Sequence, residues 1–378
     1  MVTEVTRYIN QKTERELWAR AAGRCQFEGC NKLLYRSAVT QEAVNQSQKA
    51  HIYSFSANGP RGQGPYSDDL ENINSIDNLM LMCHGCHKLI DDDKKGQRYS
   101  AKLLQDWKIV HEQRIEIVTG ISTDKRSNVI LYGANIGDEL SPLYPVECMQ
   151  SMFPERYPAS SHPIQLSMKS ALKDDTPDYW SAEVAHLEKS FERKVLTIAE
   201  DDDCKHFSLF ALAPQPLLIK LGSLLTDKFS VETYQLHREP KGWRWKEEKS
   251  DIEFIVKKPE GFSGQPVLAV ALSDHIAPSR ITNVLGEDVS IWEITIDSPN
   301  NDVISSKILL SRFRTSIRQI IVDIKREHGN QTPLHLFPVM PISCAIELGR
   351  ARMPKPDMTW IVYDHDRITQ TFKTALEI

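Results

Sequence analysis

Two short stretches of the chain concentrate side chains that bind metals. The stretch LMCHGCH holds two cysteines and two histidines within five consecutive positions, and a C-x4-C pair lies upstream. The four cysteines are Cys25, Cys30, Cys83 and Cys86. Four thiolates close a tetrahedral cage around Zn2+ and leave no open coordination position, so this spacing predicts a structural zinc. Four reduced core cysteines or a redox C-x2-C pair are the alternatives, but a redox pair needs a βαβ context that is missing here.

If zinc takes the cysteines, the nearby histidines need another explanation. His87 follows the second cysteine pair where a helix is expected to start, whereas His84, between the two cysteines, is expected to be exposed. Upstream, His51 lies in the strand-like run KAHIY, and Asn78 stands just ahead of the second such run, LMLM. The three residues His51, Asn78 and His87 therefore follow one another in the order histidine, asparagine, histidine, and this order indicates the kind of site.

This order resembles a known family. The elements AHI, DNL and C-x2-C-H, with C-x4-C upstream, resemble the HNH (ββα-metal) nuclease motif in its zinc-stapled form. The resemblance implies that His51 is the general base, that Asn78 orients the hairpin and approaches the metal, and that His87 ligates a catalytic divalent ion, Mg2+ or else Mn2+ or Ni2+. Phosphodiester hydrolysis needs a general base and a metal ligand, because a base takes the proton of the attacking water and a cation neutralises charge growing on the phosphate oxygens.

The chain departs from the motif in two ways. Many HNH sites carry an aspartate directly before the first histidine as a metal ligand, and here that position is Ala50. The stretch between His51 and Asn78 is long and rich in Gly and Pro, which predicts a flexible loop. Candidates in this loop for the missing carboxylate are Asp68, Asp69 and Glu71. A noncatalytic zinc module that only binds nucleic acid is the alternative.

Helices are expected on both sides of these motifs. The segment ERELWARAA, residues 14–22, has helical spacing and stops at Gly23. Ser100 is placed to cap a second helix, whose apolar face is formed by Leu103, Leu104, Trp107, Val110 and Ile115. These helices complete one small N-terminal unit.

Length and composition bound the remaining possibilities. At 378 residues the chain is too long for one ordinary core, and we expect a domain at 1–120, a linker at 121–140 and a second domain at 141–378. Hydrophobic residues at 40%, charged residues at 26% and a net charge of −5 are typical of a soluble globular protein. No basic excess indicates nucleic acid, although a local patch or a bound cation can still engage phosphates. Without a long apolar run or a leader, a cytoplasmic protein that does not contact membranes is expected.

The C-terminal part has a different pattern, in which apolar, β-branched runs alternate with helical stretches. The predicted strands are 252–256, 266–272, 290–296, 334–339 and 359–363. The clearest predicted helix runs from about Ile304 to His328, with Gly329 as its C-cap. This alternation predicts an α/β fold with a largely parallel sheet.

Ligands of open α/β sheets bind at the carboxyl ends of strands, so polar residues there are candidates for a binding site. The segment KGWRWK adds interleaved aromatic and basic side chains, which can stack bases while holding phosphates. The candidate ligand-binding residues are Lys220, Trp243, Trp245, Lys246, Ser273, His275, Pro341, Ser343, Arg350 and Tyr363. A hairpin edge with half-buried tryptophans, and Ser343 as a plain helix cap, are the structural alternatives. Neither a Walker loop nor GxGxxG is found, which argues against ordinary ATP or NAD binding.

This C-terminal part also resembles a family. FALAPQPLLIKLGSLL, VETYQLHRE and KGWRWK, followed by LHLFPVMPISCAIELGRARMPKPDMTWIVYD, resemble a SAVED domain, a sensor of two Rossmann-like (CARF-type) halves that binds cyclic oligonucleotides. Together with the N-terminal motifs, the whole chain resembles the HNH-SAVED effector nucleases of CBASS antiphage systems. The resemblance implies a cyclic di- or trinucleotide activator, assembly of homo-oligomers on ligand binding, and cleavage of double-stranded DNA with little sequence preference.

Two other functions stay open at this stage. A modification-dependent restriction endonuclease would use the C-terminal domain to recognise modified DNA, and it should carry a basic DNA-facing surface. A noncatalytic zinc-containing DNA-binding regulator with a ligand-sensing domain would use His51 only structurally. Its function would therefore survive replacement of His51 by alanine.

Overall fold

The computed structural model describes residues 7–135, 143–167, 178–201, 203–246, 252–366 and 371–378. The chain divides into two compact units, Met1–Ile121 and Ser122–Ile378, called here the N-terminal and C-terminal units. None of the helices in these described ranges combines the length and the apolar character that crossing a membrane requires.

The N-terminal unit contains both helices that the sequence predicted. Helix α1 spans Gln11–Arg20, and the side chain of its N-cap Asn10 accepts a hydrogen bond from the Thr13 N–H at 2.9 Å. Helix α3 spans Ala101–Thr119, and Ser100 caps it by accepting from the Leu103 N–H at 3.2 Å. Each cap satisfies an N–H that the helix itself leaves unpaired.

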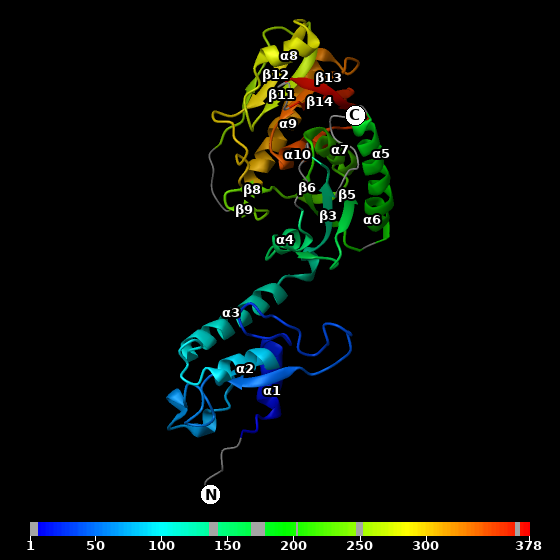
Figure 1. Ribbon diagram of the computed structural model, residues 1–378. Helices are drawn as coiled ribbons and strands as arrows, with labels where there is room; N and C mark the ends of the chain where they lie inside the picture. The colour runs from blue at the N-terminus through cyan, green and yellow to red at the C-terminus, as the bar shows by residue number, and fades with distance from the viewer. Residues whose placement is uncertain (1–6, 136–142, 168–177, 202, 247–251, 367–370) are drawn as a thin grey trace. The chain divides into compact units, whose positions relative to one another are not determined.

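Between these helices lies a hairpin followed by a helix, which is the expected ββα arrangement. Strands β1 (Ser47–His51) and β2 (Leu79–Cys83) pair antiparallel, so that His51 lies opposite Leu79, and α2 (His84–Asp92) follows directly. Helix α2 contacts both strands (Figure 1). Residues 79–82 are fully buried, and the core around them includes Leu17, Leu34, Ile52, Ile90 and Leu104.

The C-terminal unit begins with a parallel sheet. Its strand order is β4, β3, β6, β7, and β5 also pairs with β3. The strands are β3 (Arg126–Gly133), β4 (Tyr157–Pro158), β5 (Ile164–Ser167), β6 (His206–Leu212) and β7 (Ser230–Thr233). The helices are α4 (Pro145–Gln150), α5 (Tyr179–Phe191), α6 (Thr197–Asp201) and α7 (Gln215–Leu225), and a π-helical turn at Glu192–Leu196 joins α5 to α6.

The segment expected to be a linker contains a strand of this sheet. Strand β3 lies within residues 121–140, and all of its residues except Arg126 are buried. Its apolar run, VILY, is only four residues long and is flanked by polar residues, so sequence periodicity carries little signal there. In the structure this run pairs with β5 and β6, whereas Arg126 and Ser127 pair with β4, and the whole strand belongs to the C-terminal unit.

A second sheet contains four strands close to their predicted bounds, whereas the strand predicted at 252–256 forms only at Ile255–Lys257. Its order is β10, β12, β11, β13, β14, β15; the four inner strands are parallel and both edge strands antiparallel. The strands are β10 (Ile255–Lys257), β11 (Gln265–Ala271), β12 (Val289–Thr295), β13 (Leu334–Val339), β14 (Trp360–His365) and β15 (Phe372–Glu377). The helices are α8 (Pro278–Leu285), α9 (Lys307–His328) and α10 (Ile342–Ala351). Gly329 at the C-cap of α9 has φ 74°, as predicted.

The two sheets belong to two halves with the same order of elements. Apart from the additional β4 and α6, the first half runs β3, α4, β5, α5, β6, α7, β7, and the second runs β11, α8, β12, α9, β13, α10, β14. Each half carries Phe, Pro and Gly at the same spacing across its third strand and the helix that follows. These residues are Phe210, Pro214 and Gly222 in the first half and Phe337, Pro341 and Gly349 in the second. The expectation of two Rossmann-like halves is therefore confirmed.

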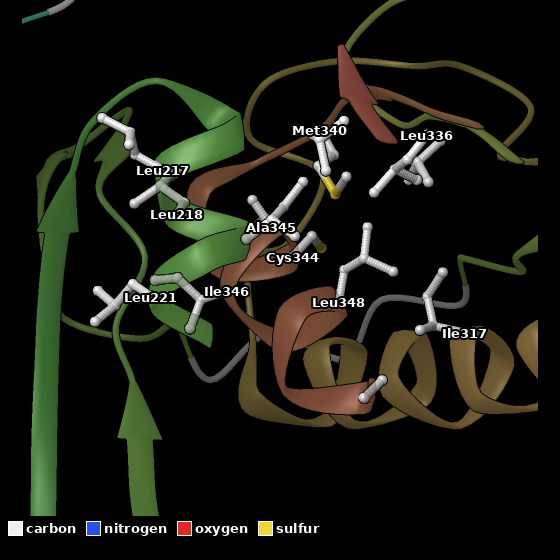
Figure 2. Packing of buried hydrophobic residues seen from close by; sticks show 14 of the residues in the cluster. Leu217, Leu218, Leu221, Ile317, Leu336, Met340, Cys344, Ala345, Ile346 and Leu348 are labelled. Atoms are coloured by element: carbon white, nitrogen blue, oxygen red, sulfur yellow. The ribbon is translucent and has the colours of Figure 1, made fainter. Parts of the chain in front are cut away.

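The equivalent helices of the two halves, α7 and α10, pack directly on each other. A Cβ atom on Gly222 would lie 2.1 Å from the Ile346 carbonyl oxygen, and one on Gly349 would lie 2.0 Å from the Ile219 carbonyl oxygen. Only glycine permits this backbone contact. Figure 2 shows Leu217, Leu218 and Leu221 of α7 beside Cys344, Ala345, Ile346 and Leu348 of α10, with Ile317, Leu336 and Met340 completing the core.

Candidate functional site

Four cysteine sulfurs gather around the start of α2. All four Sγ atoms lie within 4.8 Å of one another, and Cys30 Sγ is 3.9 Å from Cys83 Sγ. Zinc–sulfur bonds of about 2.3 Å at tetrahedral angles place sulfurs about 3.8 Å apart. The cluster of Cys25, Cys30, Cys83 and Cys86 therefore has the size and donor set to hold a structural metal, with Zn2+ as the expected ion.

Gln26 joins the two cysteine pairs. Its N–H donates to the Leu81 carbonyl oxygen at 2.8 Å, and its side-chain oxygen accepts from the Leu81 N–H at 2.7 Å. This double contact attaches the loop that carries Cys25 and Cys30 to strand β2, which ends at Cys83. The chain thus brings the four ligands together through backbone pairing as well as through the metal.

The four thiols differ in how readily they ionise. Burial raises the pKa of Cys25 to about 12, and repulsion from Cys30 and Cys83 adds to the rise. Burial also raises the pKa of Cys86. Burial opposes ionisation of Cys83 as well, but hydrogen bonds from Cys86 and the neighbouring thiols lower the pKa of Cys83 overall. Four ionised thiols this close together need a divalent ion to balance their charge.

His51 lies at the end of β1, and a side chain that the sequence did not single out holds its ring. Its Nε2 is 2.9 Å from Asn74 Oδ1, and Asn74 Nδ2 donates to the Tyr8 carbonyl oxygen at 3.3 Å. Turning the amide over would place two oxygens face to face at Tyr8, so Oδ1 faces the imidazole. An amide oxygen only accepts, which puts the proton of neutral His51 on Nε2 and leaves Nδ1 with a lone pair.

The environment of His51 favours its neutral form. Burial lowers the pKa of His51 below the ordinary value of 6.5, and the charges of Arg7 and His87 lower it further. The hydrogen bond with Asn74 and the charge of Asp91 oppose this shift without cancelling it. At neutral pH the ring is therefore able to accept a proton, which a general base requires.

Asn78 is buried and uses its side chain to bind the loop that follows β1. Its Oδ1 accepts from the Tyr53 N–H at 2.7 Å, and its Nδ2 donates to the carbonyl oxygens of Tyr53 at 3.0 Å and Ile73 at 2.8 Å. These bonds fix the chain directly after His51. The amide oxygen of Asn78 is thus engaged by a backbone N–H.

His87 lies one helical turn before Asp91 on α2. Its Nε2 is 3.3 Å from Asp91 Oδ2, and its side chain keeps 27% of its surface exposed. His84 is exposed, as expected. The loop candidates Asp68, Asp69 and Glu71 are also exposed, and Asp69 accepts a hydrogen bond from Asn72 Nδ2 at 2.8 Å.

In the C-terminal unit, the KGWRWK segment lies at a small hairpin of β8 (His237–Arg238) and β9 (Lys241–Gly242). Trp243 is 2% exposed and packs edge-on against Phe210, so it belongs to the core. Trp245 is half-buried, with its ring centroid 5.7 Å from that of His237. Lys246 Nζ donates to the Glu239 carbonyl oxygen at 2.6 Å.

The start of α10 is already engaged by the protein. Ser343 is fully buried, and both its N–H and its hydroxyl donate to Gln235 Oε1, at 3.1 and 2.7 Å. Pro341, the N-cap residue, is buried as well. Ser343 therefore joins α10 to the chain after β7 and is not the cap of the helix, because the N-cap position is taken by Pro341.

Arg350 lies at the opposite end of α10. It donates to the carbonyl oxygens of Thr226 and Phe229, each at 3.1 Å, and pairs with the fully buried Glu347 at 3.0 Å. Glu347 also pairs with Arg314 at 2.7 Å. Arg350 therefore ties α10 to the loop after α7, away from the start of that helix.

The other candidates are spread over several elements. Lys220 on α7 pairs with Glu188 at 2.6 Å. Tyr363 is buried and hydrogen-bonds His335 Nδ1 at 2.9 Å. Ser273 follows β11 and is half-buried, and His275 is exposed. The structure does not gather the ten predicted residues into one site.

One loop does bring several of them into the same region. The Asn300 N–H donates to the Leu272 carbonyl oxygen at 2.9 Å, Asp302 accepts from the Arg238 N–H at 3.1 Å, and the Ser305 carbonyl oxygen accepts from the Lys246 N–H at 3.0 Å. The loop thus connects the carboxyl end of β11 with the hairpin that carries Trp245 and Lys246.

Buried polar atoms in this region are left without a partner. Within the described residues, both ring nitrogens of His237, Trp245 Nε1 and Ser273 Oγ have no hydrogen-bond partner. His237 is 1% exposed, and burial lowers its pKa. Buried polar groups in proteins are normally paired, so these atoms are among the exceptions in the C-terminal unit. His237 was not predicted, since an isolated histidine in VETYQLHRE gives no distinguishing signal.

Comparison with protein families identifies both parts. The family described as SMODS-associated and fused to various effectors sensor domain, SAVED, matches residues 187–378, just over half of the chain. The chain belongs to the SAVED family. An HNH endonuclease family, HNH_2, matches residues 25–94, which include the four cysteines, His51, Asn78 and His87. The N-terminal unit therefore contains an HNH endonuclease domain, which supports a nuclease.

A comparison with solved structures finds SAVED receptors. Two are the Acinetobacter baumannii Cap4 SAVED/CARF-domain containing receptor with the cyclic trinucleotides 3'3'3'-cAAA and 2'3'3'-cAAA, at 14% and 13% identity, each with a TM-score of 0.44. They cover 82% of this chain and 67% and 66% of the receptor chains. The Moraxella osloensis Cap4 receptor has 12% identity and a TM-score of 0.40 over 82% of this chain and 71% of that one. The chain thus spans about two thirds of the length of these receptors. No curated protein matches it significantly.

The contact between Asn74 and His51 in the HNH domain has a measurable pH signature. Asn74→Asp places a carboxylate on Nε2 and favours protonated His51, so the midpoint of the acid limb of the cleavage rate should rise by about one pH unit. The wild-type midpoint should lie below 6.5, since the pKa of His51 is lowered. The measurement is the initial rate of plasmid cleavage between pH 5 and 8.

Ser67→Asp is the control, because it adds the same charge to the same loop at an exposed position. Its midpoint should not move. If Asn74→Asp lowers the rate without moving the midpoint, Asn74 has only a structural role.

Proposed function

We propose that the chain is a metal-dependent DNA endonuclease that a cyclic di- or trinucleotide activates, acting as an antiphage effector of the CBASS type. The observation that carries the nuclease part is the 2.9 Å contact of His51 Nε2 with Asn74 Oδ1, which leaves Nδ1 of the neutral ring with a lone pair, in the same HNH domain as His87. This pair supplies a proton acceptor and a ligand for a divalent ion, which are the two parts that phosphodiester hydrolysis needs.

The chemical step follows from these positions. A water oxygen forms a bond to phosphorus, its proton passes to His51 Nδ1, and the ester bond to the leaving sugar oxygen breaks in line. His87 would hold Mg2+, or Mn2+ or Ni2+, which supplies charge neutralisation at the phosphate oxygens. Asn78 fixes the chain after His51 and so keeps the base in position. None of these groups reads bases, so double-stranded DNA would be cut with little sequence preference.

The sensing part rests on the SAVED domain. Membership of this sensor family, together with the unpartnered polar atoms of His237, Trp245 and Ser273, supports a ligand site at the carboxyl ends of β7 and β11. An indole N–H and an imidazole can hydrogen-bond base edges, and Lys246 lies next to Trp245 in the chain to balance a phosphate. Ligand binding would shift the chain toward a larger homo-oligomer, because an effector acts by binding one state more tightly.

Calorimetric titration of the intact chain with a panel of cyclic di- and trinucleotides tests the sensing part. We expect one ligand to bind with a Kd that is micromolar or lower. Trp245→Phe removes the indole N–H and part of the ring, and it should weaken binding of this ligand by about tenfold. Trp180→Phe, on α5, is the control and should bind normally. If no cyclic nucleotide binds but modified DNA does, the chain is a restriction endonuclease instead.

A further inference from the structure

The catalytic metal site lacks its usual carboxylate at Ala50, and a different carboxylate lies beside His87. Asp91 follows His87 by four residues on α2, so both side chains leave the same face of the helix. The His87 Nε2 to Asp91 Oδ2 distance is 3.3 Å. Arg61 Nη2 lies 3.3 Å from the His51 carbonyl oxygen and 3.9 Å from Asp91 Oδ1, so Asp91 lies close to the backbone of the proposed base.

This distance matches two ligands of one cation. Two donor atoms at about 2.1 Å from an octahedral ion, in neighbouring positions, lie about 3.0 Å apart. A direct hydrogen bond from His87 Nε2–H to Asp91 is the competing explanation, and it would make Asp91 a residue that only positions His87. The two explanations differ in whether the negative charge of Asp91 is needed.

Arg61 fixes the carboxylate in this position. Its side chain is 3% exposed, and it donates to the carbonyl oxygens of Ile52 at 2.6 Å, Ile90 at 2.7 Å and His51 at 3.3 Å. Its Nη2 lies 3.9 Å from Asp91 Oδ1, the oxygen that does not face His87. Arg61 therefore connects the backbone of the proposed base to the end of α2 and leaves Asp91 Oδ2 directed toward His87.

We propose that Asp91 is the carboxylate ligand of the catalytic divalent ion, in place of the aspartate that is absent at Ala50. The ion would be held by His87 and Asp91 from one turn of α2, with water and a phosphate oxygen of the substrate completing its coordination. The loop residues Asp68, Asp69 and Glu71 are then not ligands. This inference rests on the proposed nuclease function.

Binding of Mn2+ to the full-length, zinc-loaded chain tests the proposal independently of cleavage. Free Mn2+ is measured by electron paramagnetic resonance for wild type and for variants of Asp91 and its neighbour. Asp91→Asn keeps an oxygen that can accept from His87 but removes the charge. It should weaken Mn2+ binding by about tenfold or more, as should Asp91→Ala. Asp92→Asn, at the adjacent exposed position, is the control and should bind Mn2+ as wild type does.

The outcomes separate this inference from the proposed function. If Asp91→Asn binds Mn2+ within about twofold of wild type while Asp91→Ala does not, Asp91 only positions His87 and the inference is wrong. If His87→Ala loses Mn2+ binding but both Asp91 variants keep it, another carboxylate is the ligand. If wild type binds no more Mn2+ than His87→Ala, the metal-dependent nuclease itself is contradicted. His51→Ala should bind Mn2+ normally while failing to cleave, and the zinc content of every variant should equal that of wild type.

Discussion

Replacing His51 with alanine is expected to reduce the rate of plasmid cleavage by about 10²- to 10⁴-fold, the usual contribution of a general base. The reduction is expected because His51 is the proposed proton acceptor for the attacking water. Its position at the end of β1 and its contact with Asn74 hold the ring in place, and no other described side chain has this position. Zinc content, Mn2+ binding and cyclic-nucleotide binding should stay at wild-type values. The measurement is the initial rate of conversion of supercoiled plasmid at saturating activator.

His84→Ala is the matched control for this prediction. His84 belongs to the same LMCHGCH stretch but is exposed, so its loss should leave the rate within about twofold of wild type. An unchanged rate in His51→Ala would remove the catalytic role and favour the zinc-containing regulator, in which His51 is structural.

Removing one zinc ligand should unfold the N-terminal unit. Structural zinc contributes about 10–16 kcal/mol of apparent binding free energy at pH 7, which is as large as the whole stability of a typical domain, about 5–15 kcal/mol. Cys86→Ser should therefore lose zinc, and amides of residues 7–121 should lose their protection from hydrogen exchange. Amides of the C-terminal unit should keep it, because that unit has a core of its own. The measurements are metal analysis and hydrogen exchange of the intact chain.

Cys204→Ser provides the comparison for this variant. Cys204 is a buried cysteine outside the cluster, and its Sγ donates to the Arg126 carbonyl oxygen, a bond that serine can keep. This variant should retain one zinc per chain and full protection of residues 7–121. If Cys86→Ser also retains the zinc and the protection of residues 7–121, the four cysteines are ordinary core residues.

The N-terminal unit was predictable because its signals are local. Cys25 and Cys30, and Cys83 and Cys86, are each separated by only a few residues, and spacing of this kind predicts a metal cage without knowledge of the fold. Ser100 marks the start of a helix because its side chain can cap the free N–H groups there.

In the C-terminal unit, Gly329 marks the end of a helix because glycine adopts the left-handed backbone conformation. The parallel strands from β11 to β14 are long apolar runs, so their pattern predicted strands as well.

The features that the sequence did not show depend on contacts between distant segments. Asn74 holds His51 from a loop 23 residues away in the chain, and Arg61 reaches both His51 and the end of α2. Asp91 is one of three consecutive aspartates, and only the helix register places it, rather than Asp92, beside His87. Local patterns carry no information on such pairs.

The ligand candidates show a similar limit. Ser343 and Arg350 have the residue types of a phosphate site, yet Gln235 occupies the first and backbone carbonyls with Glu347 occupy the second. Composition identifies a side chain that can bind an anion, but only the fold shows whether the protein already uses it. The equivalence of Gly222 and Gly349 was similarly visible only once α7 and α10 were seen to pack together.

The most direct test of the account is cleavage of a supercoiled plasmid by the intact wild-type chain in four parallel reactions, with and without Mg2+ and with and without the cyclic nucleotide that binds in the titration. The account predicts nicked, linear and then fragmented DNA only when both are present. Cleavage with Mg2+ alone would contradict ligand gating and favour a restriction-type enzyme. Intact plasmid in all four reactions, with the ligand bound, would contradict the nuclease itself.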